Sequence, residues 1–240
     1  MLELFLSSLP DTRTLLAVSA IAVAYLGIVT WFVGYLKTRK QVRTAYTRKI
    51  FHFLVFTAVT IVHLIWRLPG VTVFGIVSTL LVIYTVSKGD GFPLYEALAR
   101  PADAPHRTLF IIVPLITTAL AGITTNSLFP SYAFVGYLVC GWGDAVGEPV
   151  GSRWGRHKYA VPSFAGVRAQ RSVEGSFAVF LTGSIAAVIG LMAAGLKTDT
   201  AIWGGLACGA AGAVVEAIST HGLDNFTTQV AAAATAAWLL

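Results

Sequence analysis

Asp144 and Glu148 lie four residues apart in a polar stretch, Gly141–Ser176, of an otherwise apolar sequence. On a helix this spacing places both carboxylates on one face, where they repel each other unless a cation is present. A hard cation such as Mg²⁺ takes oxygen ligands of this kind and completes its shell with water and phosphate. The alternative is that both are solvated residues at a helix end, because Pro149 disfavours helical geometry at Glu148. Spacing alone supports the two interpretations equally.

Glycines and basic side chains accompany the acidic pair. Glycine lets backbone N–H groups approach phosphate oxygens, while arginine binds phosphate through two contacts and lysine binds it as a point charge. Taken alone, these residues are equally typical of an ordinary basic loop. Together with the carboxylates they predict a site for a nucleoside triphosphate and its metal. The residues concerned are Gly141, Gly143, Gly147, Gly151, Gly155, Arg153, Arg156 and Lys158.

The common nucleotide-binding motifs of soluble proteins do not match this stretch. GSRWGRHK (151–158) lacks the GxxxxGK[ST] pattern of the P-loop, and GWGDAVG (141–147) is not GxGxxG. The HRD and DFG segments of protein kinases are also missing from the sequence. A protein-kinase-like site is therefore excluded.

Composition places the chain in a membrane. Hydrophobic residues make up 56% of the sequence and charged residues 12%, with a mean hydropathy of +0.74. Soluble domains carry about 25% charged residues. The two cysteines, Cys140 and Cys208, lie in apolar runs and offer neither a disulfide framework nor a structural zinc site.

Eight apolar segments are candidate spans. About 20 apolar residues cross a bilayer, so we expect a single all-α membrane domain (1–240), a polytopic protein with about 7–8 transmembrane helices and a cytoplasmic glycine-rich polar loop. The recurrent glycines of the later segments predict close helix packing. The segments are 14–36, 50–66, 71–86, 108–128, 131–147, 177–196, 200–219 and 226–240; these glycines are Gly136, Gly183, Gly190, Gly204, Gly205, Gly209 and Gly212.

The basic residues predict the orientation of the chain. Fourteen of the seventeen lysines and arginines fall in loops on one side, and only Arg13, Arg67 and Lys197 fall on the other. The positive-inside rule makes the richer side cytoplasmic. Topology therefore explains the net charge of +6 without nucleic acid as a partner. We expect a prokaryotic plasma membrane, because the chain is compact and shows no targeting extension.

Ionisable residues from other segments fall on the same predicted face as the polar stretch. They flank the second, third and seventh spans, which favours a cytosol-facing site for a soluble, charged substrate. These residues are Arg48, Lys49 and His52, then Lys88, Asp90 and Glu96, then Glu216, His221, Asp224 and Asn225.

Several of these segments resemble one known family. GDAVGEPVGSRWGRHK (143–158) followed by RSVEGS (171–176) resembles the signature of the CTP-dependent polyprenol kinases, the group of dolichol, phytol and farnesol kinases. TRKIFHF (47–53) and EAISTHGLDNFTTQ (216–229) resemble its flanking elements in the same order. The resemblance therefore covers a lipid-kinase-like core, 47–229, with a nucleotide and metal loop at 141–176.

The resemblance implies transfer of the γ-phosphoryl group of CTP to the hydroxyl of an isoprenoid lipid alcohol. It implies Mg²⁺ held by Asp144 with help from Glu148, and it leaves Asp144, Glu174 and Asp224 as alternative catalytic carboxylates. The implied nucleotide-binding residues are Gly143, Gly147, Gly151, Arg153, Gly155, Lys158, Arg171, Ser172, Gly175, Ser176 and Asn225. Further implied pocket residues are Arg48, Lys49, His52 and Glu216.

The sequence departs from the family's pattern at two positions, and two functions other than a polyprenol kinase stay open. The family's usual lysine before the serine of the KSxEGS element is Arg171 here, and Phe226 replaces the commoner leucine after the Asp-Asn pair. One rival is another CTP–lipid enzyme, either a diacylglycerol kinase or a phosphatidate cytidylyltransferase, although the long Asp-rich signature of the latter is missing from the sequence. The other is a transporter, which would place ionisable residues near the bilayer midplane.

A cysteine substituted for Ala160 tests the orientation. We expect Ala160→Cys to react with a membrane-impermeant thiol reagent only from the cytoplasmic side, because residue 160 lies among the basic residues of the polar stretch. Labelling from the outer side in sealed vesicles contradicts the predicted topology.

Overall fold

The computed structural model describes residue 6, residues 8–163 and residues 169–240. Arg168, one of the basic residues counted for orientation, lies outside the described residues. Helices dominate the fold, which confirms an all-α membrane protein. The chain divides into two compact units, Met1–Leu115 (unit 1) and Ile116–Leu240 (unit 2). The boundary falls within helix α5 (Leu109–Leu128).

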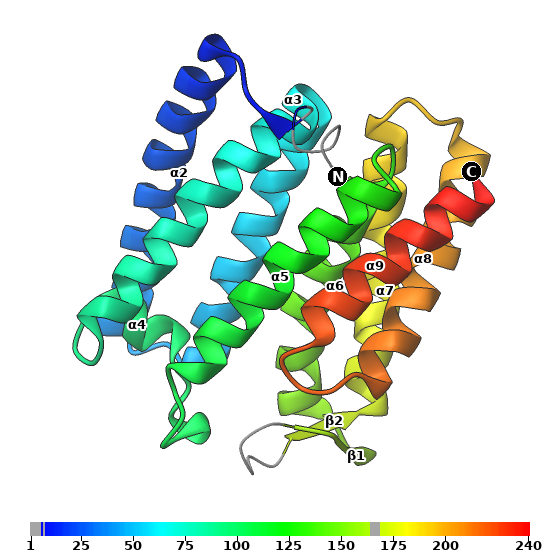
Figure 1. The fold of residues 1–240 in the computed structure, drawn as a ribbon. Helices are drawn as coiled ribbons and strands as arrows, with labels where there is room; N and C mark the ends of the chain where they lie inside the picture. Colours follow the sequence, from blue (N-terminus) through cyan, green and yellow to red (C-terminus); the bar gives the residue numbers. More distant parts are fainter. Residues whose placement is uncertain (1–5, 7, 164–168) are drawn as a thin grey trace. The chain divides into compact units, whose positions relative to one another are not determined.

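The described residues of unit 1 before α5 form two long helices and a short one. α2 begins after Asp11, whose side chain accepts a hydrogen bond from the N–H of Thr14 at 2.6 Å and so satisfies a donor that the helix leaves unpaired. α3 breaks at Arg67 (φ 53°, ψ −150°), two residues before Pro69. Its two arms change direction there (Figure 1) and correspond to the predicted spans 50–66 and 71–86. The elements are α2 (Thr12–Thr38), α3 (Thr44–Lys88), α4 (Pro93–Leu98) and the 3₁₀ helix η1 (Pro101–Asp103).

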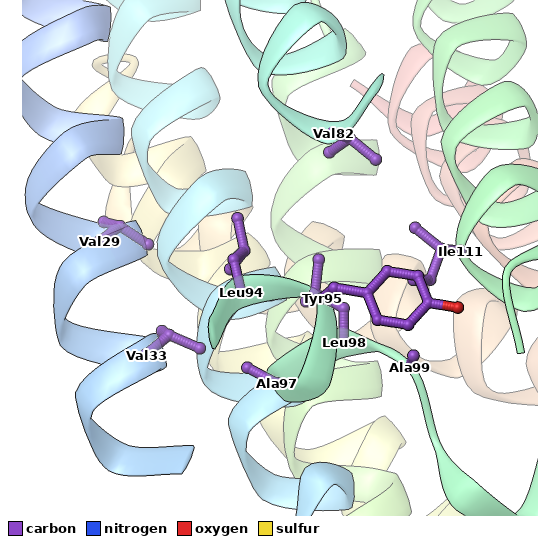
Figure 2. Packing of buried hydrophobic residues seen from close by; sticks show 9 residues of the cluster. All are labelled: Val29, Val33, Val82, Leu94, Tyr95, Ala97, Leu98, Ala99 and Ile111. Atoms are coloured by element: carbon purple, nitrogen blue, oxygen red, sulfur yellow. The ribbon is translucent and has the colours of Figure 1, made fainter. Parts of the chain in front are cut away.

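A buried apolar cluster holds α4 within unit 1 (Figure 2). The cluster consists of Val29, Val33, Val82, Leu94, Tyr95, Ala97, Leu98, Ala99 and Ile111. Leu94 of α4 is fully buried, and the Tyr95 hydroxyl lies 2.8 Å from Oγ1 of Thr108. Thr47 of α3 donates a hydrogen bond to the Ala97 carbonyl at 2.7 Å. Burial and these polar contacts together fix a helix of only six residues, which would not be stable alone.

Among its described residues, unit 2 contains the second part of α5, a bundle of four further helices and a small β-hairpin at one end of that bundle (Figure 1). α6 packs on α7, α7 on α8 and α8 on α9, and α9 returns to α6. The hairpin strands are antiparallel, with Lys158 opposite Ser172 and Val161 opposite Ala169. The elements are α6 (Ala133–Trp154), β1 (Lys158–Val161), β2 (Ala169–Ser172), α7 (Val173–Ala193), α8 (Thr198–Ile218) and α9 (Asp224–Leu239).

Glycines allow these helices to approach closely. A Cβ added to Gly205 would lie 2.8 Å from the backbone nitrogen of Val188, and one added to Gly183 would lie 3.8 Å from the Cα of Gly209. The predicted close packing is confirmed, since an added Cβ would meet a neighbouring atom within 4 Å at each predicted glycine. These are Gly136, Gly183, Gly190, Gly204, Gly205, Gly209 and Gly212.

Within the residues that the structure describes, five helices are long and apolar enough to cross a membrane by length and composition: α2, α3, α5, α7 and α8. α3 has 45 residues and contains two of the predicted spans. The remaining two predicted spans, 131–147 and 226–240, correspond to α6 and α9, which do not meet this criterion. α9 has only 16 residues, and α6 carries Asp144 and Glu148.

The polar stretch 141–176 differs from the continuous loop that its glycines suggest. α6 continues through Pro149 to Trp154, so the helix does not end at Glu148. A proline inside a helix removes one backbone hydrogen bond. The tight packing of Gly147 and Gly151 against Gly175 of α7 holds this part of α6 in place. Only the hairpin and its connections are non-helical among the described residues of the stretch.

The close contact of α7 with α8 gives a stability prediction. A Cβ on Gly209 would lie 2.6 Å from the backbone nitrogen of Ser184 and 2.8 Å from its Cα, so we expect Gly209→Ala to lower the free energy of unfolding by about 1–3 kcal/mol. Gly27→Ala is the matched control, because an added Cβ there meets nothing within 4 Å. Thermal unfolding in detergent measures both, and equal midpoints contradict this packing.

Candidate active site

Asp144 and Glu148 lie one helical turn apart on a continuous α6, and both are half-buried. Contacts one turn earlier show which way this part of the helix faces, because the Cys140 thiol lies 3.7 Å from Oδ1 of Asn225 in α9. Asp144 follows Cys140 by four residues and therefore shares its face. α6 and α9 are antiparallel, with Gly136 against Gln229, so this face leads towards the first residues of α9.

Arg171 of β2 connects a second pair of carboxylates, those of Glu216 and Asp224, at the end of the bundle. Its Nε lies 2.8 Å from Oε1 of Glu216 in α8, and its Nη2 donates to Oδ2 of Asp224 in α9 at 2.9 Å. Its Nη1 donates to the backbone carbonyls of Glu216 and Ser219, the latter at 2.9 Å. The side chains of Arg171, Glu216 and Asp224 are only 11%, 10% and 17% exposed. Three predicted site residues thus form one ion-pair network.

The Asp224 carboxylate is held at both oxygens. Oδ2 accepts from Arg171, and Oδ1 accepts from the N–H of Asn225 at 3.1 Å. Asn225 is itself buried, and its side-chain amide donates to the Thr118 hydroxyl of α5 at 2.8 Å. The Asp-Asn pair at the start of α9 therefore has one residue facing the ion-pair network and one fixed in the bundle.

Ser172 and Glu174 organise the start of α7. Ser172 is the N-cap, and its hydroxyl accepts a hydrogen bond from the N–H of Gly175 at 3.1 Å. The Glu174 carboxylate lies 2.7 Å from Nδ1 of His157 and accepts from the His157 backbone N–H at 3.3 Å. Because a helix N-terminus favours negative charge, Glu174 is well placed electrostatically.

The hairpin is hydrogen-bonded to α7 and to the turn between α8 and α9. The Tyr159 hydroxyl of β1 lies 2.7 Å from the Ser176 hydroxyl of α7. The His221 N–H donates to the Pro162 carbonyl at 2.8 Å, which links the chain after β1 to the turn between α8 and α9. These contacts place the hairpin beside the Arg171 network.

The predicted phosphate-binding glycines have defined packing positions. Gly143, Gly147 and Gly151 lie within α6, on the face that contacts Val179, Gly175 and Ser172. Gly155 ends α6 with its Cα against Ser172. Close packing accounts for these glycines, and their contact with a nucleotide stays a prediction.

Exposed cations gather where α6 ends. Arg153, Arg156 and Lys158 are exposed, and the Arg153 guanidinium lies 5.0 Å from the centre of the Trp154 ring. A hollow of about 520 Å³ opens beside them. Its lining residues are Arg153, Trp154, Gly155, Arg156, His157 and Glu174. In the part of the chain that the structure describes, these three cations have no carboxylate within ion-pair distance, so their charge is available to an anion.

The predicted pocket residues of span two lie in unit 1. Arg48 lies 3.8 Å from Asp103, which also pairs with Arg100 at 2.9 Å. Lys49 is buried, and the His52 ring stacks on Phe56 at 4.3 Å. Their predicted contribution to the site of unit 2 stays a prediction.

The acidic residues suit a cation that needs few protein ligands. Over the described residues, no group of three or more His, Cys, Asp or Glu side chains comes close enough to hold a metal. Mg²⁺ is commonly held by one or two carboxylates, with water and substrate phosphates completing its shell. Asp144 and Glu148 match that donor set in number and kind.

Sequence reasoning missed the hairpin and the residues that it positions. Tyr159 and His157 contact Ser176 and Glu174, two predicted site residues, but neither was singled out. Tyr159 and Val161 in KYAV (158–161) favour a strand, whereas Lys158 and Ala160 do not, so the signal was weak. Four residues are too few to distinguish a strand from a loop without its partner.

The comparisons with known proteins agree with the motifs. The chain is 28% identical over 214 residues to a phytol kinase from Synechocystis sp., an alignment that covers 89% of this chain and 87% of the relative. No family model matches the chain, and no solved structure matches it. The similarity extends over both units.

Along most of its length the chain is therefore similar to a member of the polyprenol kinases. This confirms the resemblance carried by the segments at 143–158 and 171–176.

The cap of α7 gives a prediction for the site. We expect Ser172→Ala to lower the free energy of unfolding by about 1 kcal/mol, because the N–H of Gly175 loses its acceptor. Ser152→Ala, an exposed serine of α6, is the control and should change little. Thermal unfolding in detergent measures the difference; an unchanged midpoint for Ser172→Ala shows that the cap does not stabilise the helix.

Proposed function

We propose that this protein transfers the γ-phosphoryl group of CTP to the hydroxyl of an isoprenoid alcohol, with phytol as the first candidate. The observation that carries the proposal is the similarity to phytol kinase along nearly the whole chain. The polar end of unit 2 supports it, because carboxylates and unpaired cations meet there at the ends of apolar helices.

Phosphoryl transfer requires positioning and charge neutralisation more than covalent chemistry. In our proposal Arg153, Arg156 and Lys158 bind the nucleotide phosphates, because they are exposed beside the hollow at the end of α6. Arg153 and Arg156 offer paired donors and Lys158 a point charge. The cytosine preference rests on the family resemblance.

Asp144 and Glu148 would hold Mg²⁺. When bound, the ion would supply positive charge that offsets the charge of the phosphate groups during transfer. The two residues contribute a half-buried carboxylate pair fixed on a rigid helix, which the tight contact between Gly147 and Gly175 keeps in place.

The alcohol oxygen forms a bond to the γ-phosphorus as the bond to the bridging oxygen of CDP breaks, and the hydroxyl proton passes to a carboxylate. Asp224 and Glu174 are the candidates beside Asp144. The Asp224 carboxylate is oriented at both oxygens, whereas that of Glu174 is paired with the exposed His157. Orientation favours Asp224.

The lipid would reach this end from the side. Val173 and Phe177 of α7 are 57% and 62% exposed and flank Glu174 in sequence. An apolar chain can lie along this surface while its hydroxyl reaches the carboxylates. In this proposal the polar end faces the cytoplasm of a prokaryotic cell, where CTP is present.

Purified full-length protein in detergent, with CTP or ATP labelled in the γ-phosphate, tests the proposal. The lipid panel is phytol, farnesol, geranylgeraniol, dolichol and diacylglycerol. We expect label from CTP in an isoprenoid alcohol. Label in diacylglycerol alone identifies a diacylglycerol kinase. A separate incubation with phosphatidate and CTP labelled in the α-phosphate identifies a cytidylyltransferase through labelled CDP-lipid, because the γ-phosphate leaves in pyrophosphate in that reaction. Label in no lipid overturns the kinase proposal.

Asp144→Asn tests the carboxylate pair. We expect turnover to be abolished, because the amide cannot replace the carboxylate as a ligand of a hard cation. Asp199→Asn, at an exposed position of α8, is the matched control and should leave turnover unchanged. Steady-state kinetics and thermal unfolding separate loss of chemistry from loss of fold. A fully active Asp144→Asn protein removes Asp144 from the proposed metal site.

A further inference from the structure

Arg171 is the most heavily engaged cation at the polar end. A guanidinium has five N–H donors, and four of these point to Glu216 Oε1, the Glu216 carbonyl, the Ser219 carbonyl and Asp224 Oδ2. The side chain is 11% exposed. It therefore has little surface and one N–H left for any further partner.

Two of these partners are carbonyls at the C-terminal end of α8. The last carbonyls of a helix lack intrahelical donors and carry partial negative charge, which a cation stabilises. Arg171 thus acts as a C-terminal cap for α8 while it pairs with the carboxylate at the start of α9. One side chain spans the whole turn between the two helices.

The surroundings of Arg171 are unfavourable for phosphate. Two carboxylates, those of Glu216 and Asp224, lie within 3 Å of its nitrogens. The three side chains together carry one net negative charge, which repels an approaching phosphate. Arg153, Arg156 and Lys158 are exposed instead and lie at the hollow or next to it.

We propose that Arg171 is a positioning residue, which orients Asp224 and fastens the hairpin to the turn between α8 and α9, and not a ligand of the nucleotide. The inference deepens the proposed function and rests on it for its kinetic part. Arg171 fixes Asp224 Oδ2 while the Asn225 N–H fixes Oδ1, so the carboxylate is held in one orientation. The same side chain holds β2, and with it Ser172 at the start of α7.

Arginine has the geometry for this task and lysine does not. The planar guanidinium presents donors in several directions, whereas a lysine ammonium is a single point that cannot reach partners on both helices. Arg171→Lys therefore keeps the charge and loses most of the contacts. Arg171→Gln loses both the positive charge and most of the contacts.

The experiment measures the full-length protein in detergent by two independent methods. Amide hydrogen exchange without substrate reports directly on the contacts by which Arg171 fastens the hairpin to the turn between α8 and α9. We expect Arg171→Gln to speed exchange about tenfold in β2 and in residues 219–224 and to leave α2 unchanged. Arg39→Lys, an exposed arginine of unit 1, is the control.

Kinetics with CTP and the accepted lipid alcohol distinguish positioning from binding. We expect kcat to fall about 100-fold in Arg171→Gln and about tenfold in Arg171→Lys, because a misplaced catalytic group slows the chemical step. The KM for CTP should stay within about twofold of the wild-type value, since no contact to the nucleotide is lost.

Unchanged exchange in β2 and residues 219–224 overturns the proposal, as does a raised KM for CTP with unchanged kcat. The exchange measurement needs no substrate, so its result is valid even if no lipid accepts phosphate. Failure of the positioning proposal can therefore be distinguished from failure of the kinase proposal. If Arg171→Gln does not fold, Arg171→Lys and Glu216→Gln provide the same exchange test. Faster exchange in the same two segments supports the positioning role of Arg171, and wild-type exchange in both variants overturns that role.

Discussion

The polar end of unit 2 depends on how closely α6 and α7 approach each other. At Gly147, Gly151 and Gly175 the two backbones are in direct contact, and an added Cβ on Gly175 would lie 3.0 Å from the Gly147 carbonyl. Small residues are the usual means of such approach between membrane helices, where apolar burial provides no driving force. The contact fixes where α6 ends and α7 begins. The hairpin, Ser172 and Glu174 take their positions from it.

Electrostatics divides the charged residues of this end into two groups. Glu216 and Asp224 are paired with the buried Arg171, and Glu174 is paired with His157. Arg153, Arg156 and Lys158 remain exposed at the rim. Charges that are largely buried are costly unless they are paired, which accounts for the pairing of Glu216 and Asp224 with Arg171. The second group gives the rim a positive potential suited to an anionic substrate.

Much of this organisation could be predicted from the sequence. Hydropathy predicted the helices, glycine spacing predicted close packing, and the ionisable residues of segments 143–158, 171–176 and 216–229 do meet at one end of unit 2. The partners of Arg171 could not be predicted, because they lie 45 and 53 residues away and depend on how α8 and α9 pack. The continuation of α6 through Pro149 could not be predicted either, since local preference opposed it and tertiary contact with α7 prevailed.

Pro149 also changes the backbone beside the acidic pair. Because proline has no N–H, the carbonyl of Ala145 lacks the donor that residue 149 would otherwise supply. This oxygen lies along α6 between the levels of Asp144 and Glu148. In an apolar bundle a carbonyl without its helical donor attracts water. The proline therefore leaves a backbone oxygen of α6 available for hydration by water, next to the two carboxylates.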